Sequence, residues 1–261
     1  MRIVILTCNP KGVASRVLPV LCGREPIDIA GVVLAHGVSP NRKRNIRRKI
    51  EKTLKIGLFG ALNGIRMRRW YADDGVEDIR SLCKSLNVEL RETPSINCDT
   101  TKKLFREAKA DLGLSLGNGY IPKGVFSIPT YGMINIHTEI LPEFQGAQGV
   151  IWPIYEGRTE TGFTIHQIDE NIDTGDILFQ KRIPIRFFPS LRDTVRHNVS
   201  TVRAMVPDAF VHVCENYLPL KEKAIPQGAG KSYTTPSLWE FLRMVKHNRA
   251  MYKEDPGKIA P

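Results

Sequence analysis

The sequence predicts an α/β fold with a Rossmann-like, doubly wound and mostly parallel β-sheet, followed by a short C-terminal extension. Apolar runs of strand length, such as 2–8 (RIVILTC) and 27–36 (IDIAGVVLAH), alternate with segments whose apolar residues have helical spacing. This order is typical of parallel strands that helices cover on both faces. The 261 residues, 42% hydrophobic and 25% charged, are enough to bury a large core.

Each element is expected from its own pattern. Apolar residues at helical spacing predict a helix at 14–22, between the first two strands. The basic segment 41–69 has the pattern of an amphipathic helix that is interrupted near Gly57–Gly64. Further helices are expected at 76–86, 100–110, 146–157, 191–216 and 237–248, and further strands at 88–94, 111–117, 132–141, 161–169 and 176–185.

The composition argues against several classes of protein. The five cysteines form no CxxC pair, which argues against a zinc ribbon or a disulfide framework and favours the cytoplasm as the expected location. No apolar run approaches the ~18 residues of a membrane span, and we interpret the first residues as a strand, not as a signal peptide. The net charge of +11 is concentrated in 41–69, where eleven Lys and Arg residues oppose one Glu.

The segment 135–146 (NIHTEILPEFQG) marks a candidate site. Asn135, His137 and Glu139 occupy alternate positions, so a strand places all three on one face. In doubly wound sheets the ligand binds beyond the carboxyl ends of the strands. Chemically distinctive residues lie at three such ends: SLGNGYIP (115–122), NIHTEILP (135–142) and HQIDENIDTGD (166–176).

These motifs resemble the 10-formyltetrahydrofolate-dependent formyltransferase family. That family includes methionyl-tRNA formyltransferase, glycinamide ribonucleotide transformylase and the amino-sugar N-formyltransferases. Its pattern is Asn-x-His, then Leu-Pro, then Gly, and an Asp-x-Gly about 35 residues after the His. The matching residues here are Asn135 and His137, Leu141 and Pro142, Gly146, and Asp173 and Gly175. The resemblance is strongest from 112 to 185, and the order of elements fits from Met1.

The resemblance implies a catalytic domain at 1–205, with the basic segment 41–69 inserted, and a helix and hairpin extension at 206–261. It also implies three catalytic roles. The Asn135 amide donates to the oxyanion that forms when a formyl group moves to an amine. His137 polarises the carbonyl or carries a proton, and Asp173 orients the imidazole.

The same resemblance implies that 10-formyltetrahydrofolate is the formyl donor. Its pteridine would lie against two short stretches, contacting mainly their backbone. By carry-over from the family, these are Gly119, Tyr120 and Ile121 in one stretch, and Glu170, Asn171 and Ile172 in the other. No metal is expected, because DENIDTGD (169–176) lacks the turn glycine and the final Glu of a calcium loop.

The acceptor that we expect is the amine of a nucleotide-linked or lipid-linked deoxy-amino sugar for surface polysaccharide, a small-molecule substrate. A methionyl-tRNA formyltransferase-like enzyme and a formyltetrahydrofolate hydrolase are alternatives. A third alternative is a non-catalytic protein that binds membranes or nucleic acid through 41–69. Segment 41–69 could serve as a peripheral membrane contact at the inner face, a homodimer contact or, less favoured, a nucleic-acid contact.

Three further residues are interpreted from their context alone. His166 lies in an expected strand without chemical partners nearby in the sequence, so it is interpreted as structural. His36 ends the second strand at the level of the crevice, and a structural role is favoured for it as well. Glu139 is interpreted as an exposed charge at a strand end, with contact to a cationic acceptor amine as the alternative.

Overall fold

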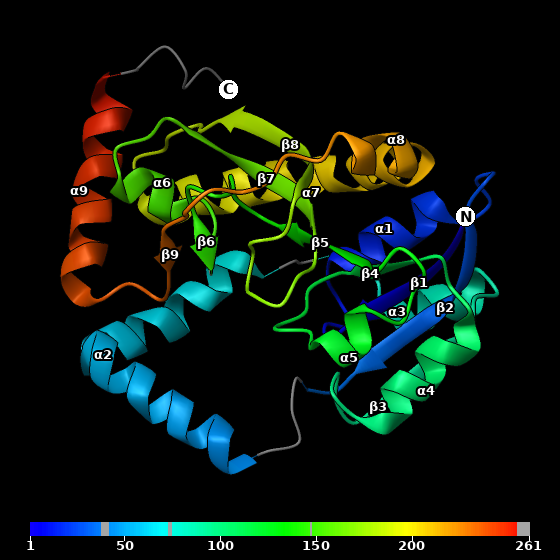
Figure 1. The fold of residues 1–261 in the computed structure, drawn as a ribbon. Helices are drawn as coiled ribbons and strands as arrows, with labels where there is room; N and C mark the ends of the chain where they lie inside the picture. The colour runs from blue at the N-terminus through cyan, green and yellow to red at the C-terminus, as the bar shows by residue number, and fades with distance from the viewer. Residues whose placement is uncertain (38–41, 73–74, 147, 255–261) are drawn as a thin grey trace.

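A seven-stranded mixed sheet forms the centre of the protein. The computed structural model describes residues 1–37, 42–72, 75–146 and 148–254 (Figure 1). The strand order is β3-β2-β1-β4-β5-β7-β8. The strands are β1 (Arg2–Thr7), β2 (Asp28–Ala35), β3 (Leu90–Thr93), β4 (Leu112–Ser115), β5 (Met133–His137), β7 (Glu160–Gln167) and β8 (Ile177–Pro184). The first five strands are parallel, whereas β7 and β8 are antiparallel to their neighbours.

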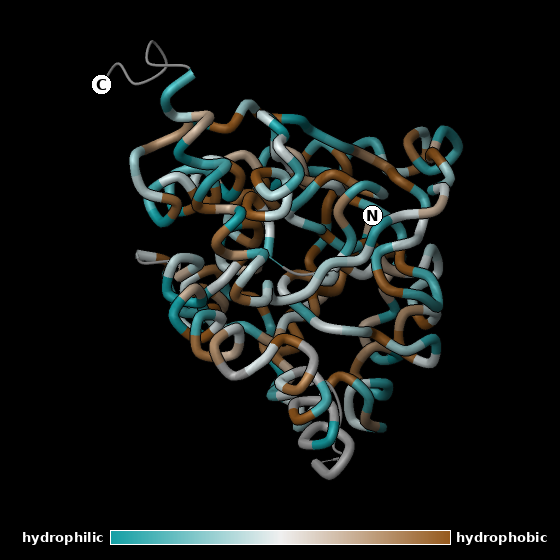
Figure 2. Tube along the Cα trace, turned by 90° about the vertical axis from the view of Figure 1, so that its left-hand side faces the viewer, coloured by the Kyte–Doolittle hydropathy of each residue, from teal (hydrophilic) through white to brown (hydrophobic). Residues whose placement is uncertain are grey.

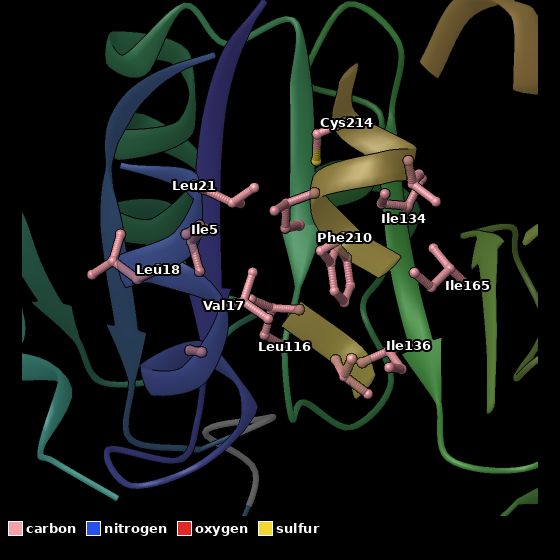
Figure 3. Close-up of a cluster of buried hydrophobic side chains, with 14 of the residues drawn as sticks. Ile5, Val17, Leu18, Leu21, Leu116, Ile134, Ile136, Ile165, Phe210 and Cys214 are labelled. Carbon is pink, nitrogen blue, oxygen red and sulfur yellow. The ribbon is translucent and has the colours of Figure 1, made fainter. Parts of the chain in front are cut away.

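The uniformly apolar strands are buried on both faces. In β1, Ile3 and Ile5 belong to one core cluster, while Val4 and Leu6 belong to another on the opposite face. Helices α1 (Val13–Leu21), α3 (Ile79–Ser85) and α7 (Leu191–Glu215) contribute to the first cluster (Figure 3). Helices α4 (Asp99–Ala108) and α5 (Lys123–Phe126) contribute to the second. The predicted doubly wound, mostly parallel fold is therefore confirmed.

The order of strands reverses at β1: the chain runs outward from β1 to β2 and β3, then crosses back to β4 on the other side of β1 and continues to β5. A reversal of this kind opens a crevice at the carboxyl ends of the strands. The segment that follows β4 and the end of β5 both lie at this edge, so the fold brings two of the three motif segments together.

Helix α2 (Arg42–Arg68) comes after β2 in the chain, and in Figure 1 it lies at the lower left, away from β2 and β3. It is kinked at Gly57, whose φ of 74° and ψ of 165° are not helical, so the predicted interruption is confirmed. Figure 2 shows hydrophobic residues interspersed with hydrophilic ones along the chain. None of the helices in the described ranges is long and apolar enough to cross a bilayer.

The C-terminal part returns to the motif segment 135–146. Helix α7 runs across residue 205, so the boundary between the two expected parts falls inside a helix. After α8 (Tyr217–Glu222), the two-residue strand β9 (Ser232–Tyr233) pairs in parallel with β6 (Gln145–Gly146). Helix α9 (Leu238–Glu254) then joins α6 (Ile151–Tyr155) and the 3-10 turn η1 (Arg69–Tyr71) in a third core cluster.

Candidate active site

The candidate site lies where the parallel part of the sheet meets the antiparallel part. Asn135 in β5 pairs with Ser115 of β4 on one side and with His166 of β7 on the other. His137, two residues further along β5, is opposite Thr164. The period of two places Asn135, His137 and His166 on the same face of the sheet.

Asp173 reaches this face from the loop between β7 and β8. Its Oδ2 lies 3.4 Å from Nδ1 of His137, and its Oδ1 lies 3.7 Å from Nε2 of His166. Oδ2 also accepts a hydrogen bond of 3.1 Å from the backbone N–H of Gly146. The φ of Asp173 is 57°, a left-handed conformation that few residues other than glycine and Asn or Asp adopt. The three predicted catalytic residues therefore come together around one carboxylate.

The hydrogen bonds of His137 fix its neutral tautomer. Nε2 lies 2.6 Å from the backbone carbonyl of Phe144. A carbonyl oxygen can only accept, so Nε2 carries the hydrogen and Nδ1 keeps a lone pair. That lone pair faces Asp173. When Nδ1 accepts a proton, the adjacent Asp173 carboxylate stabilises the positively charged imidazolium that forms.

His166 orients the amide of Asn135. Nδ1 of His166 lies 2.7 Å from the backbone carbonyl of Gln167 and therefore carries the hydrogen. Nε2 is left as an acceptor, 3.3 Å from Nδ2 of Asn135. The amide donates one hydrogen to His166 and keeps the other for a further acceptor.

Burial and charge set the protonation states of the pair. Burial lowers the pKa of His137 below its ordinary value, and the opposing effects of Asp173 and the Phe144 carbonyl only partly offset this. Burial alone would raise the pKa of Asp173, but its interactions with the imidazoles of His166 and His137 and the hydrogen bond from the Gly146 amide together bring that pKa below its ordinary value. At neutral pH the site therefore holds a neutral imidazole beside a carboxylate.

Two glycines of the motif allow the backbone to approach closely around Asp173. A Cβ on Gly146 would lie 2.2 Å from the carbonyl oxygen of Tyr233, and its φ is 97°. A Cβ on Gly175 would lie 2.0 Å from the carbonyl oxygen of Gln167. Both distances are too short for any side chain, so glycine at these two positions holds the loop that carries Asp173 against the sheet.

Glu139 is buried, so both interpretations of it from the sequence are wrong. Its side chain is 2% exposed and accepts hydrogen bonds from the N–H groups of Val150 and Ile140 and from the hydroxyl of Thr161. Burial is the main cause that raises the pKa of Glu139 to about 7. The sequence could not reveal that Glu139 is buried, because its hydrogen-bond donor Thr161 lies in a strand more than twenty residues further along the chain.

The interpretation of His166 as purely structural is incomplete. This imidazole is buried and contacts both Asn135 and Asp173, two of the residues expected to act in catalysis. The alternation in β7 could have indicated that His166 faces the same side as its neighbours on β5. The pairing of Asn135 with His166, however, depends on the antiparallel register. His36, in contrast, lies on the surface, with Nε2 2.6 Å from a carboxylate oxygen of Glu92.

The two stretches expected to bind the folate lie next to each other. Nζ of Lys123, close to 119–121, is 2.5 Å from a carboxylate oxygen of Glu170. The apolar side chains of Tyr120 and Ile172 are 45% and 60% exposed and are therefore available to a flat ring. Asn171 and Gly119 are also exposed. The side chain of Ile121 is 3% exposed and packs in the core, so only its backbone could contact a ligand.

One buried polar atom near these stretches has no partner in the protein. Asn118 donates from Nδ2 to the carbonyl of Leu6 and to the hydroxyl of Ser115, but its Oδ1 is buried without a hydrogen bond. Ser115 is the partner of Asn135 in the sheet. An unpaired acceptor beside β5 fits a ligand that supplies N–H donors, as a pteridine does. Within the described ranges, no group of three His, Cys, Asp or Glu side chains is placed to hold a metal ion.

The chain was compared with known proteins. Residues 91–211 match the family described as Formyl transferase. The chain is 31% identical over 145 residues to a methionyl-tRNA formyltransferase of Ehrlichia canis, which covers 55% of this chain and 48% of the relative. It is 43% identical over 91 residues to the Deinococcus radiodurans enzyme of the same name, covering 34% and 28%. The chain thus spans less than half the length of these two curated relatives.

Solved structures resemble this fold over most of its length. WlaRD, a sugar 3N-formyl transferase crystallised in the presence of dTDP and 5-N-formyl-THF, aligns with a TM-score of 0.56 at 16% identity, over 95% of this chain and 77% of that one. A sugar N-formyltransferase from Shewanella sp. FDAARGOS_354 aligns with a TM-score of 0.56 at 15% identity, over 95% and 87%. At such low identity the likeness is one of fold.

Proposed function

Residues 91–211 match the formyl transferase family, and from that premise we propose that this chain transfers a formyl group from 10-formyltetrahydrofolate to the primary amine of a deoxy-amino sugar carried on a nucleotide or a lipid. The observation that carries the proposal is the convergence of Asn135, His137 and Asp173 on one face of the sheet. A neutral imidazole backed by a carboxylate, beside an amide with a free donor, is the equipment that acyl transfer to an amine requires.

The bound donor supplies a formyl carbon attached to a tetrahydrofolate nitrogen. Asn135 would donate its remaining amide hydrogen to the formyl oxygen as that oxygen gains negative charge. Loss of such a donor in other enzymes costs about 3 kcal/mol of transition-state stabilisation. The hydrogen bond from Asn135 to His166 holds the amide in the orientation that this role needs.

His137 would accept the proton that the attacking amine loses, and would return it to the tetrahydrofolate nitrogen as the bond between that nitrogen and the formyl carbon breaks. Nδ1 is the nitrogen with the lone pair, and Asp173 lies 3.4 Å from it, so the charged imidazole that forms is stabilised without any movement of the chain. The Phe144 carbonyl holds the ring from the other side. The backbone at 119–121 and at 170–172 would bind the donor.

Two lines of support bear on the acceptor. The alignments with sugar formyltransferases extend over 95% of this chain. A second candidate is methionyl-tRNA formyltransferase, which the sequence relatives favour and which the basic segment 41–69 suits. We favour the sugar because less than half the length of those relatives is matched.

The test is a formylation assay with 10-formyltetrahydrofolate and a panel of nucleotide-linked amino sugars, with product detected by mass spectrometry. Charged initiator tRNA and a reaction without any amine form two further arms. We expect formylated sugar, and we expect His137→Ala to lower its rate by at least about 100-fold. His212→Ala, at an exposed histidine on α7, is the matched control and should retain the wild-type rate.

The three arms separate the candidate functions. Formylated methionyl-tRNA without formylated sugar would replace the proposed acceptor by the second candidate. Donor turnover without any amine would identify a hydrolase. If the donor is unchanged in all arms, the chain is not a formyl-transferring enzyme and the proposal is wrong.

A further inference from the structure

Helix α2 has an apolar face that the rest of the described protein does not cover. The buried face of its second half comprises Ile56, Gly60, Gly64 and Met67, and the glycines allow close approach to 235–237. Exposed residues occupy the opposite face: Phe59 is 68% exposed, Leu62 56% and Ile65 59%. One packed face is enough to hold a surface helix, so the second apolar face is left to contact something outside the chain.

The apolar surface continues onto α9. Phe59 and Leu62 of α2, together with Leu238, Phe241 and Leu242 of α9, line a groove of about 360 Å³. Leu242 of α9 is 46% exposed, and Trp239 of the same helix is 78% exposed. Exposed aromatic and aliphatic side chains from two helices thus form one surface.

An arginine-lined concavity of about 680 Å³ adjoins this groove. Its five arginines are Arg66, Arg69, Arg192, Arg196 and Arg249, all exposed, and Asp193 is the single carboxylate among the residues that line it. Arg66 and Phe241 line both the concavity and the groove, so the two are continuous. The Arg66 guanidinium lies over the rings of Trp70 and Phe241, at 5.7 and 5.2 Å from their centroids.

We propose that this surface docks on a bilayer of anionic lipids. The apolar side chains of α2 and α9 enter the boundary between headgroups and acyl chains, and the arginines of the concavity bind lipid phosphates. Guanidinium groups beside exposed apolar residues match the two chemistries of such a surface. The inference does not depend on formyl transfer, because none of these residues belongs to the candidate active site.

Two other occupants match the surface less well. A second copy of the chain related by two-fold symmetry would place its own arginine cluster against this one, and like charges would repel. Nucleic acid would satisfy the arginines but would leave Phe59, Leu62 and Trp239 exposed to water.

The test is co-sedimentation of the full chain with vesicles of phosphatidylglycerol and phosphatidylethanolamine, and with vesicles of phosphatidylcholine alone. We expect binding to the anionic vesicles that weakens as salt is added. Arg69→Gln combined with Arg249→Gln should weaken binding about 25-fold, at about fivefold for each arginine. Phe59→Ser and Trp239→Ser should each weaken it about tenfold.

Two matched controls remove an arginine charge and an apolar side chain from parts of the protein surface outside the proposed docking surface. Arg106→Gln, at an exposed arginine of α4, removes the same charge, and Leu218→Ser, at a 51% exposed leucine of α8, removes a comparable apolar side chain. Neither should change binding. Absence of binding to anionic vesicles would overturn the proposal, as would equal losses in test and control variants. So would a dimer in light scattering that Phe59→Ser dissociates, since a second copy would then be the occupant.

Discussion

The chemistry of the site depends on the two nitrogens of His137. Nε2 is engaged by the Phe144 carbonyl, so Nδ1 is the nitrogen able to accept a proton, and its neighbour is Asp173. An Asn side chain at 173 would present to Nδ1 of His137 either an N–H, which would hydrogen-bond to the lone pair of Nδ1, or an uncharged carbonyl oxygen. Either outcome removes the group that stabilises the imidazolium.

Asp173→Asn is therefore expected to lower kcat by at least about 100-fold while leaving the melting temperature close to that of the wild type. Steady-state kinetics together with thermal unfolding would check this. The wild-type rate should rise with pH as His137 loses its proton, with the inflection below pH 6.5 because burial lowers the pKa of this imidazole. An inflection above that value, or full activity in Asp173→Asn, would exclude Nδ1 as the base.

Glu139 links stability to pH. Its pKa is raised from 4.5 to about 7 by burial, so in this range the folded protein holds a proton that the unfolded chain has released. The contribution of this carboxyl to the free energy of unfolding is therefore complete below pH 4.5 and is lost as pH rises through about 7.

Glu139→Gln should flatten this dependence and lower the free energy of unfolding by about 1–3 kcal/mol, because an amide N–H would then face the N–H of Ile140. Urea denaturation between pH 5 and 8, roughly the range over which the group titrates, measures both effects. Glu160→Gln, at an exposed carboxylate of β7, is the control. A pH dependence that survives in Glu139→Gln would show that another group causes it.

At the scale of elements, the short pair β6 and β9 connects the C-terminal part to the site. Gly146 of β6 lies against the backbone of Tyr233 in β9, and its N–H donates to Asp173. The ring of Tyr233 packs on Phe144 and Trp152, with centroids 5.6 and 4.5 Å away. The position of Asp173 thus depends on a strand about sixty residues further along the chain.

Gly146→Ala should force β6 and β9 apart, because the new Cβ cannot remain 2.2 Å from a carbonyl oxygen. We expect a loss of about 3 kcal/mol in the free energy of unfolding, from displaced backbone and from a positive φ, and a reduced kcat. Gly228→Ala, where a Cβ meets nothing within 4 Å, is the matched control and should leave both unchanged. If Gly228→Ala lowered the free energy of unfolding and kcat as much as Gly146→Ala does, separation of β6 from β9 would not be the cause of these losses.

The elements differ in how far the sequence could predict them. Val4 and Ile5 lie in a continuous apolar run, and the burial of β1 on both faces follows from that run alone. The kink of α2 follows from the glycines at 57–64. The strands β6 and β9 have two residues each, too few for any periodicity, so their pairing could not be predicted.

At the scale of the whole molecule, the fold class and the place of the site follow from the order of elements, whereas the full set of site residues does not. Asn135, His137 and Asp173 were predicted because their spacing matches a family pattern, and the structure brings them together. His166 and Glu139 were misjudged because their partners come from the register of β7 and from the fold of 139–150. Such contacts leave no local pattern in a sequence.

The pairing of β9 with β6 also determines what a single break in the chain would do. A protease that cuts between α8 and β9 would leave every proposed catalytic side chain covalently intact, yet the loop around Gly146 would lose the strand that lies against it. Amide hydrogens of 145–146 and of 232–233 should then exchange with solvent together, as one opening unit. Proteolytic nicking at this one connection would therefore be expected to abolish the proposed formyl transfer.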